Sequence, residues 1–381
     1  MLISTLTSAV ALPVGVELGG YGAVRPSREA SDALEINGLR FSCADNGKRV
    51  SLVSLDTLYP GDLVERFRDD DETYLFAASH THTAPMLDSA KAGIGAVDPR
   101  ALDAHVDVIS GTQWREREVD AVTLFSTTVD VPIYRRRDNP NHALNRALTA
   151  HCGMYPNSRE AIDRSLHLLA LMEGDEAVCV LIWHSCHPTS RSDLKQVSAD
   201  YVAAIRRGVR ARFGPATPCL FLQGCAGDIR PDSRSKRIKW LPNSDLNTCF
   251  LNPTSPQEQD RIDDQYFHAV LAATEIERKP LDTLRCDSRP YRLTNGRVGE
   301  IPSMVVGESY WLDFLPFEVS HRYWLEARNA SPRRFIVSCS GEVQGYLPHP
   351  TQMRAGGYEV DGSRVLVGAP ERFTLADRGW W

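Results

Sequence analysis

The sequence has no run of eighteen apolar residues, the length that a transmembrane helix requires, so we expect no membrane-spanning helix. Its nine cysteines are odd in number, and none stands in a Cys-x-x-Cys pair. Neither a disulfide framework nor a thiolate zinc site is therefore indicated, and a reducing cytoplasm fits best. The apolar opening segment, Met1 to Leu18, lacks the basic n-region of a signal peptide, and we interpret it as the first strand.

An excess of positive charge is also missing. The chain has 43 Lys and Arg against 49 Asp and Glu, which gives a net charge of −6 and a pI near 6.0. We therefore expect no general attraction to nucleic acid or to an anionic membrane, and a small-molecule substrate instead. Two local basic segments, Arg135 to Arg137 and Arg234 to Lys239, are candidate substrate contacts.

Internal repeats, low-complexity tracts and an obvious interdomain linker are absent as well. The 381 residues with 42% apolar content suffice for a substantial core. The simplest organisation is one continuous domain, residues 1–381. The oligomeric state is not indicated.

Alternating strand and helix patterns predict an α/β (mixed α+β) fold, a mixed β-sheet core flanked by helices. Strands are expected over residues 34–43, 49–55, 73–79, 166–172, 177–183, 219–222, 282–292, 303–306, 310–315 and 334–338. Helices are expected near residues 60, 100–110, 200–209, 261–278 and 319–328. The region 86–160 otherwise reads as irregular, and residues 135–145 as a long loop near a site.

Two histidines stand one residue apart at the end of the apolar run 73–79. Strand alternation places His80 and His82 on one face, at one point. Imidazole is the commonest protein ligand of zinc, so a metal site is the first hypothesis, although a bare His-x-His is more often structural.

The strand 177–183 also ends in histidines, His184 and His187. The odd separation between them indicates that His184 faces away from a site shared with His187. The strand 219–222 leads into a small-residue loop, Gln223 to Pro231, whose backbone amides are expected to be free to meet a ligand. In this region Asp200 and Asp228 read either as catalytic groups or as a helix cap and a carboxylate that satisfies the loop.

These motifs together resemble the neutral (non-lysosomal) ceramidase family. His80-Thr-His82-Thr-Ala-Pro resembles the family's His-Thr-His-Ser-Gly-Pro, and Cys186-His187-Pro-Thr-Ser followed by Ser198-Ala-Asp200 resembles its His-Pro-Thr and Ser-Ala-Asp segment. Leu222-Gln-Gly-Cys-Ala-Gly-Asp228 is similar to its glutamine-to-aspartate loop, and Gly345-Tyr346-Leu-Pro with Tyr358-Glu359 to its C-terminal tyrosine motifs. The nearest form is the short bacterial one, without the C-terminal immunoglobulin-like domain.

The resemblance implies one zinc ion, Zn2+, held by His80, His187, Glu318 and Tyr346. Glu342 is the rival for the carboxylate, because Leu-Pro-Phe-Glu318 only approximates the family's Pro-Gly-Glu. Tyr346 is either a loose fourth ligand or a hydrogen-bond donor to an oxyanion.

One position departs from the family. Where ceramidases have Gly-Asp-Val-Ser-Pro, with a serine required for their amidase activity, this chain has Gly227-Asp228-Ile229-Arg230-Pro231. Arginine cannot replace a serine hydroxyl as a nucleophile, but its planar fork suits a carboxylate or a phosphate. The alternative is that Arg230 pairs with Asp228 or Asp232.

We therefore expect a zinc-dependent amidohydrolase, not a true ceramidase, that cleaves a linear amide bond of a small anionic substrate through a zinc-activated water. His82, Tyr346 and Asp228 are the expected catalytic residues, and Arg230, Gln223 and Gly224 the substrate-binding ones. Alternatives are an ester or lactone hydrolase, an amide-forming biosynthetic enzyme on the same site, and a non-catalytic metal-binding module.

Overall fold

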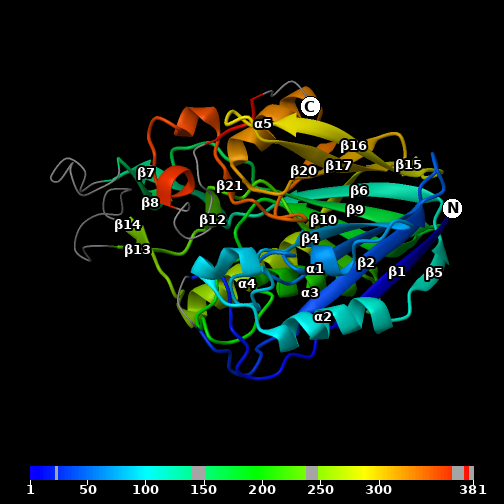
Figure 1. Ribbon diagram of the computed structural model, residues 1–381, viewed down its shortest axis with the longest axis horizontal. Helices are drawn as coiled ribbons and strands as arrows, with labels where there is room; N and C mark the ends of the chain where they lie inside the picture. Colours follow the sequence, from blue (N-terminus) through cyan, green and yellow to red (C-terminus); the bar gives the residue numbers. More distant parts are fainter. Residues whose placement is uncertain (22–24, 140–150, 237–247, 363–372, 377–381) are drawn as a thin grey trace.

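The computed structural model describes residues 1–21, 25–139, 151–236, 248–362 and 373–376, and shows a mixed α+β fold built on several β-sheets (Figure 1). The expected fold class is confirmed. Among the helices that these ranges contain, none combines the length and the apolar character needed to span a bilayer.

The first sheet has five strands and carries a helix layer on its outer face. Its strands, in spatial order, are β4 (Glu72–Ala78), β3 (Arg49–Leu55), β2 (Glu35–Ser42), β1 (Leu2–Ala9) and β5 (Arg115–Glu118). The strands expected over residues 34–43 and 49–55 correspond to β2 and β3, which pair antiparallel across residues 45–48, and β3 and β4 run parallel. Helices α1 (Leu63–Arg66) and α2 (Pro99–Gly111) pack on apolar side chains of this sheet, and α2 follows its outer face in Figure 1.

The second sheet also has five strands. Their order is β11 (Cys219–Gln223), β10 (Glu176–His184), β9 (Ser165–Glu173), β6 (Ala121–Thr128) and β15 (Thr274–Pro280). Strand β10 is apolar almost throughout because both of its faces are covered. One face contributes to the core shared with the first sheet, and the other packs against α3 (Tyr201–Phe213) and α4 (Pro256–Ala272).

A third sheet closes the shared core from above in Figure 1. It consists of β16 (Leu284–Arg292), β17 (Val298–Val306), β18 (Tyr310–Phe314) and β20 (Arg334–Val337). Helix α5 (His321–Ala330) lies beside it and brings Trp324 within 4.2 Å of Trp183 of the second sheet, measured between ring centroids. This packing fixes the ends of β10 and β18 relative to one another.

Short strands gather beyond the ends of β9 and β10, on the left in Figure 1 and opposite the N-terminus. They form three small groups: β12 (Ile229–Pro231), β7 (Pro132–Asp138) and β8 (Cys152–Asn157); β13 (Arg234–Lys236) and β14 (Thr248–Phe250); and β19 (Glu318–Val319) and β21 (Tyr346–Leu347). They provide much of the framework around the site described below.

The interpretation of residues 86–160 as irregular was wrong. Besides the expected helix, which is α2, this region contains β5 to β8, and Arg135 lies inside β7 instead of in a loop. The charged side chains of β7 hide the strand from an apolar pattern, because the structure satisfies them with buried ion pairs. The part of the expected loop from residue 140 to residue 145 falls outside the described residues.

Candidate metal centre

His80 follows the end of β4 in an unusual backbone conformation. Its φ is 67°, in the left-handed region that few residues other than glycine adopt. The His80 amide donates to the Thr57 carbonyl at 2.9 Å, which helps to fix this turn. His80 and His82 do meet, with their Nε2 atoms 3.4 Å apart. The turn, and not strand alternation, brings them together. Strain of this kind is frequent at functional sites.

Two imidazoles are held with their Nε2 atoms aimed at one carboxylate oxygen. His80 Nδ1 lies 2.9 Å from the Leu58 carbonyl, and His187 Nδ1 lies 2.6 Å from the Ala226 carbonyl. A carbonyl only accepts, so each Nδ1 carries the hydrogen and each Nε2 presents its lone pair when the ring is neutral. Both Nε2 atoms lie 3.2 Å from Glu318 Oε2.

Glu318 is the carboxylate of this site. It lies on β19, opposite Tyr346 of β21 in a parallel pair. Its second oxygen, Oε1, accepts a hydrogen bond from the Tyr59 hydroxyl, which leaves Oε2 for the histidines. Glu342, the rival from the sequence, is 63% exposed and faces Arg68 at 3.5 Å. The structure therefore places Glu318, and not Glu342, beside the histidines.

The charges of this group compensate one another. Burial alone would raise the pKa of Glu318, but His80 and His187 hold it well below its usual range. Burial alone would lower the pKa of His80, and the neighbouring Cys339 and Glu318 raise it well above normal instead. Burial, together with Arg135, lowers the pKa of His187 to about 4. Burial and the other two histidines lower the pKa of His82. Without an ion, one imidazolium thus balances one carboxylate.

We call His80, His82, His187 and Glu318 the metal centre. Ligand atoms of the three histidines all lie within 4.8 Å of one another. Two imidazole nitrogens and a carboxylate oxygen match the ligand set of catalytic zinc, which leaves a position open for water or substrate. His82 Nδ1 is buried and has no hydrogen-bond partner. The chemistry of the donors therefore fits a divalent metal, and whether His82 ligates it or carries protons stays open.

Tyr346 and Arg135 border the metal centre. Arg135 Nη2 donates to the Tyr346 hydroxyl at 3.0 Å, and its Nη1 lies 3.4 Å from His187 Nε2. Glu359 orients this arginine by accepting from Nε at 2.9 Å. Burial and the Glu318 charge raise the pKa of Tyr346. Tyr346 is thus a neutral phenol close to the carboxylate when no metal is bound.

Sequence reasoning missed Tyr59 altogether and saw Arg135 only as part of a basic segment. Arg135 and Arg136 grip opposite oxygens of Glu359, at the second of the two tyrosine motifs quoted from the sequence. A buried carboxylate needs a cation, so the Tyr358-Glu359 motif and the basic segment could have been matched as partners from the sequence. Tyr59 left no signal, since its partner is 259 residues away in the chain.

Two solved structures resemble this fold closely in shape. The neutral ceramidase from Pseudomonas aeruginosa matches 94% of this chain and 70% of its own, with a TM-score of 0.69 and 14% sequence identity. The chain has the neutral ceramidase fold. A structure described as a ceramidase complexed with C2 matches 94% of this chain and 71% of its own, with a TM-score of 0.64 and 13% identity. No family model and no curated protein matches the sequence.

The neutral ceramidase resemblance is thus confirmed at the level of the fold. Ceramidases are hydrolases, so this fold serves hydrolysis in its solved relatives. At 14% identity the comparison does not establish the reaction of this chain. The four expected ligands, His80, His187, Glu318 and Tyr346, nevertheless come from distant motifs and lie together in the structure.

Asp228 lies in a loop of the neutral ceramidase fold with both oxygens occupied. Its Oδ1 accepts from the His321 amide at 2.7 Å, at the start of α5. Its Oδ2 accepts from Ser320 Oγ and from Gln352 Nε2, each at 2.6 Å. These contacts favour the loop-satisfying alternative over a catalytic one, because both oxygens already accept hydrogen bonds from Ser320, His321 and Gln352. Its catalytic role stays a prediction.

Gln223 and Gly224 do not present the donors that the sequence indicated. The Gly224 amide donates to the His184 carbonyl at 2.7 Å, and Gln223 Nε2 donates to the Cys186 carbonyl at 2.9 Å. A side chain at position 224 would collide with Trp183, so this glycine is required for close packing. The expectation of a free Gly224 amide is therefore wrong, because the end of β10 uses it.

Arg230 lies on β12, opposite Ile133 of β7, and is 6% exposed. The alternative that it pairs with Asp228 or Asp232 is not seen in the described part of the chain. Asp228 is occupied as above, and Asp232 faces Arg234 at 2.6 Å. Position 230 thus carries a buried cation where the ceramidase motif has serine.

His184 faces away from the metal centre, as the parity of the strand predicted. Its Nδ1 lies 2.9 Å from the Ser165 carbonyl, and its Nε2 lies 2.9 Å from the Tyr266 hydroxyl. Burial lowers its pKa to about 4, so the ring is neutral. Both nitrogens are satisfied, which makes His184 a structural histidine.

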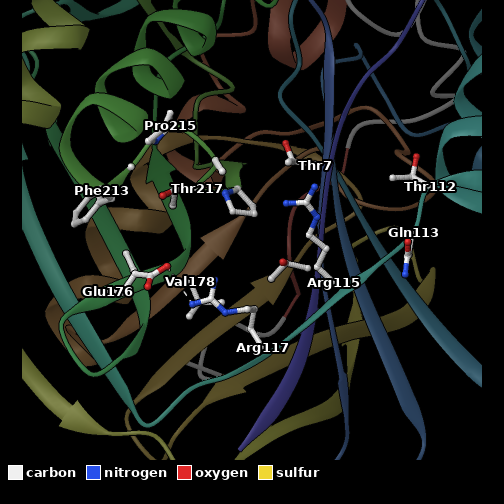
Figure 2. A pocket seen from close by; sticks show the side chains of 15 residues that line it. Thr7, Thr112, Gln113, Arg115, Arg117, Glu176, Val178, Phe213, Pro215 and Thr217 are labelled. Atoms are coloured by element: carbon white, nitrogen blue, oxygen red, sulfur yellow. Dashed lines mark hydrogen bonds and ion pairs between the residues drawn. The ribbon is translucent and has the colours of Figure 1, made fainter.

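A cavity of about 410 Å³ at the other end of the second sheet is separate from this site (Figure 2). Arg115 and Arg117 of β5 line it from one side, and Pro215 and Thr217 of the loop before β11 from the other. It adjoins the start of β10, whereas His187 follows the end of that strand. The expected site residues do not line it.

Proposed function

We propose that the protein is a zinc-dependent hydrolase that cleaves an amide bond of a small anionic molecule through a zinc-activated water. One observation carries the proposal: His80 Nε2 and His187 Nε2 both lie 3.2 Å from the same Glu318 oxygen. The neutral ceramidase fold and the location of this group supply the context. The substrate differs from ceramide because position 230 is arginine and not serine.

Zinc would be held by His80, His187 and Glu318, with Tyr346 beside the open position, either as a loose fourth ligand or as a hydrogen-bond donor. Zinc in such a site lowers the pKa of water toward about 7 and polarises a carbonyl. The Leu58 and Ala226 carbonyls orient the two imidazoles. Partners of this kind fix the tautomer of a ligating histidine and increase its basicity.

His82 is the proposed proton carrier. Its Nε2 lies beside His80 Nε2, so it reaches the place where the scissile carbonyl would be attacked. Burial and the neighbouring histidines lower the pKa of His82, so the resting ring is neutral. The lowered pKa makes the ring a weak base, but a proton that it takes from the attacking water is then passed on readily to the leaving amine.

Tyr346 and Arg135 are proposed to stabilise the developing oxyanion. Arg135 donates to the Tyr346 oxygen, which directs the phenolic hydrogen elsewhere, toward an acceptor at the metal centre. A preorganised donor at an oxyanion contributes about hundred- to thousandfold in rate. Asp228 supports the site by holding the loop before β12 against α5, and the same reaction geometry would serve an ester.

The state of the cysteines supports the proposed cytoplasmic location. All nine are free thiols in the structure, even Cys179 and Cys219, which are buried on the adjacent strands β10 and β11. Burial raises the pKa of both thiols to about 12, so they are inert small core residues. Free cysteines are typical of reducing compartments.

A panel of N-acyl amino acids, neutral fatty amides and esters tests the proposed function. We expect turnover of an amide by the zinc-loaded protein, loss of turnover after chelation, and recovery when one equivalent of zinc is returned. His187→Ala should be inactive under all three conditions, and His184→Asn should behave as the unaltered protein does. Zinc binding without turnover of any amide or ester would favour the non-catalytic alternative.

A further inference from the structure

Arg230 is a buried cation with almost no partners. Its Nη2 makes one long contact, 3.4 Å to the Leu251 carbonyl, and its Nε is buried without a hydrogen bond. The guanidinium stacks on the Phe250 ring at 4.4 Å from the centroid. A buried charge is costly unless it is paired and hydrogen-bonded. The edge of this guanidinium thus lacks an anion.

The carboxylates nearest to Arg230 are occupied by other donors. Asp200 is the carboxylate whose charge acts on Arg230, and Asp228 and Asp232 are neighbours of Arg230 two positions away in the chain. Ser320 and Gln352 donate to Asp228, and Arg234 pairs with Asp232. Arg191 and Ser190 contact Asp200. Within the described residues, no acidic side chain forms an ion pair with Arg230. The missing anion must therefore come from outside this set.

Arg230 adjoins the metal centre through two neighbours. The carbonyl of Ile229, the preceding residue, lies 3.0 Å from His187 Nδ1. The ring of Tyr21 lies 5.0 Å from the ring of His82. Burial raises the pKa of Tyr21, and the Arg230 charge is the strongest influence that opposes this rise. The Tyr21 ring thus borders His82, and its hydroxyl lies within electrostatic reach of Arg230.

The Tyr21 hydroxyl is available to the same ligand. No hydrogen bond joins it to another described residue, and its ring lies under the Arg25 guanidinium at 4.7 Å. Arg25 itself donates to the backbone carbonyls of Gly19, His82 and Leu194. Within the described residues, Arg230 Nε and the Tyr21 hydroxyl thus have no hydrogen-bond acceptor, and Arg230 has no ion-pair partner.

We propose that Arg230 and Tyr21 form a subsite that binds a carboxylate of the substrate, so that the substrate is an N-acyl amino acid or a similar amide with an acid group close to the scissile bond. This deepens the proposed function and rests on it. One guanidinium edge matches the two oxygens of a planar carboxylate, and one positive charge matches its single negative charge. A phosphate dianion would need a second cation with free donors, but Arg191 is paired with Asp263, and both Nη atoms of Arg25 are bonded to backbone carbonyls.

Paired substrates test this subsite. We would compare N-acetylglycine with N-acetylglycinamide, which differ only in the carboxylate, and with N-acetylaminomethylphosphonate, on the zinc-loaded protein. We expect kcat/KM to favour the carboxylate over the neutral amide by about ten- to a hundredfold. Arg230→Gln should abolish the preference, and Arg230→Lys should retain part of it. Arg234→Gln, at a nearby arginine that is already paired, should retain all of it.

Binding measurements separate this inference from the proposed function. Isothermal titration calorimetry of the same three compounds with the same variants reports the carboxylate preference even where no turnover occurs. Absence of hydrolysis with a preserved preference that depends on Arg230 would overturn the proposed function and uphold the subsite. Equal binding of the carboxylate and the neutral amide, tighter binding of the phosphonate, or an equal loss for all compounds in Arg230→Gln would overturn the subsite.

Discussion

The metal centre and the Arg230 subsite lie side by side but differ in how their polar groups are satisfied. In the metal centre, His80, His187 and Glu318 satisfy one another, and backbone carbonyls orient both imidazoles. In the subsite, Arg230 has one long contact to a backbone carbonyl and, among the described residues, no ion-pair partner, and the Tyr21 hydroxyl bonds to none of those residues. The first region is preorganised by the protein alone, whereas the second is completed only by a ligand. In the proposed function, catalysis and substrate selection thus belong to two separate groups of residues.

The largest expected effect is the loss of metal when one imidazole is removed. His80→Ala and His187→Ala should each purify without stoichiometric zinc, because a carboxylate and one imidazole cannot complete the ligand set. Elemental analysis by mass spectrometry checks this. His184→Asn is the matched control, since His184 is also buried but bonds to Ser165 and Tyr266. Full zinc content in both alanine variants would refute the assignment.

Removing Arg135 should affect the reaction more than metal binding. Arg135→Gln loses the donor to Tyr346, and we expect kcat to fall about hundred- to thousandfold while zinc content is kept. Arg136→Gln is the control, because Arg136 grips the other oxygen of Glu359 without contacting Tyr346. An equal decrease of kcat in the two variants would contradict this role, because it would show that activity depends on the ion pairs with Glu359 and not on the contact with Tyr346.

Tyr59→Phe tests the support of the metal ligand. Without the hydroxyl, Glu318 Oε1 is left unpaired in a buried site and the carboxylate can rotate. We expect zinc affinity to fall about ten- to a hundredfold, as is typical for partners of metal ligands. Competition with a fluorescent chelator measures it. Tyr310→Phe removes a similar bond, from Tyr310 to Glu277 at 2.7 Å, and should leave zinc affinity unchanged.

The smallest effect concerns stability. Arg230→Met removes a buried charge without an ion-pair partner, so the melting temperature should stay the same or rise slightly. Arg206→Met removes a buried arginine that is paired with Asp56, and breaking such a pair costs about 3–5 kcal/mol. Its melting temperature should fall by several degrees. Similar decreases in the two variants would show that Arg230 is a structural residue, and the comparison between the two regions would fail.

Much of the fold was readable from the sequence where burial decides the pattern. Strand β10 and the pair β2 and β3 were predicted well because their apolar runs have turn residues at both ends. Strand β7 was missed because its arginines look solvent-exposed in sequence and are buried against Glu359 in the structure. Helix α4 ends at Ala272, six residues earlier than expected, because β15 pairs with β6 from Thr274 onward. The single-domain organisation stays a prediction.

The side chains that meet at the candidate metal centre were readable from the sequence, but their surroundings were not. His80, His187 and Glu318 follow short motifs, whereas Tyr59 and Tyr21 act through contacts between distant parts of the chain. The reversed expectation at Gly224 has the same cause, since the loop amide bonds to the end of a neighbouring strand. Local patterns identify residue types suited to chemistry, and long-range packing decides which of them remain available.

A crystal structure of the zinc-loaded protein, with anomalous diffraction recorded at the zinc absorption edge, tests the central claim most directly. We predict one strong anomalous peak per chain, about 2.0–2.2 Å from His80 Nε2, His187 Nε2 and a Glu318 oxygen. A peak within bonding distance of His82 but not of Glu318 would mean that His82, and not Glu318, is the third ligand. Absence of any peak among these four side chains, in protein that contains zinc, would contradict the account.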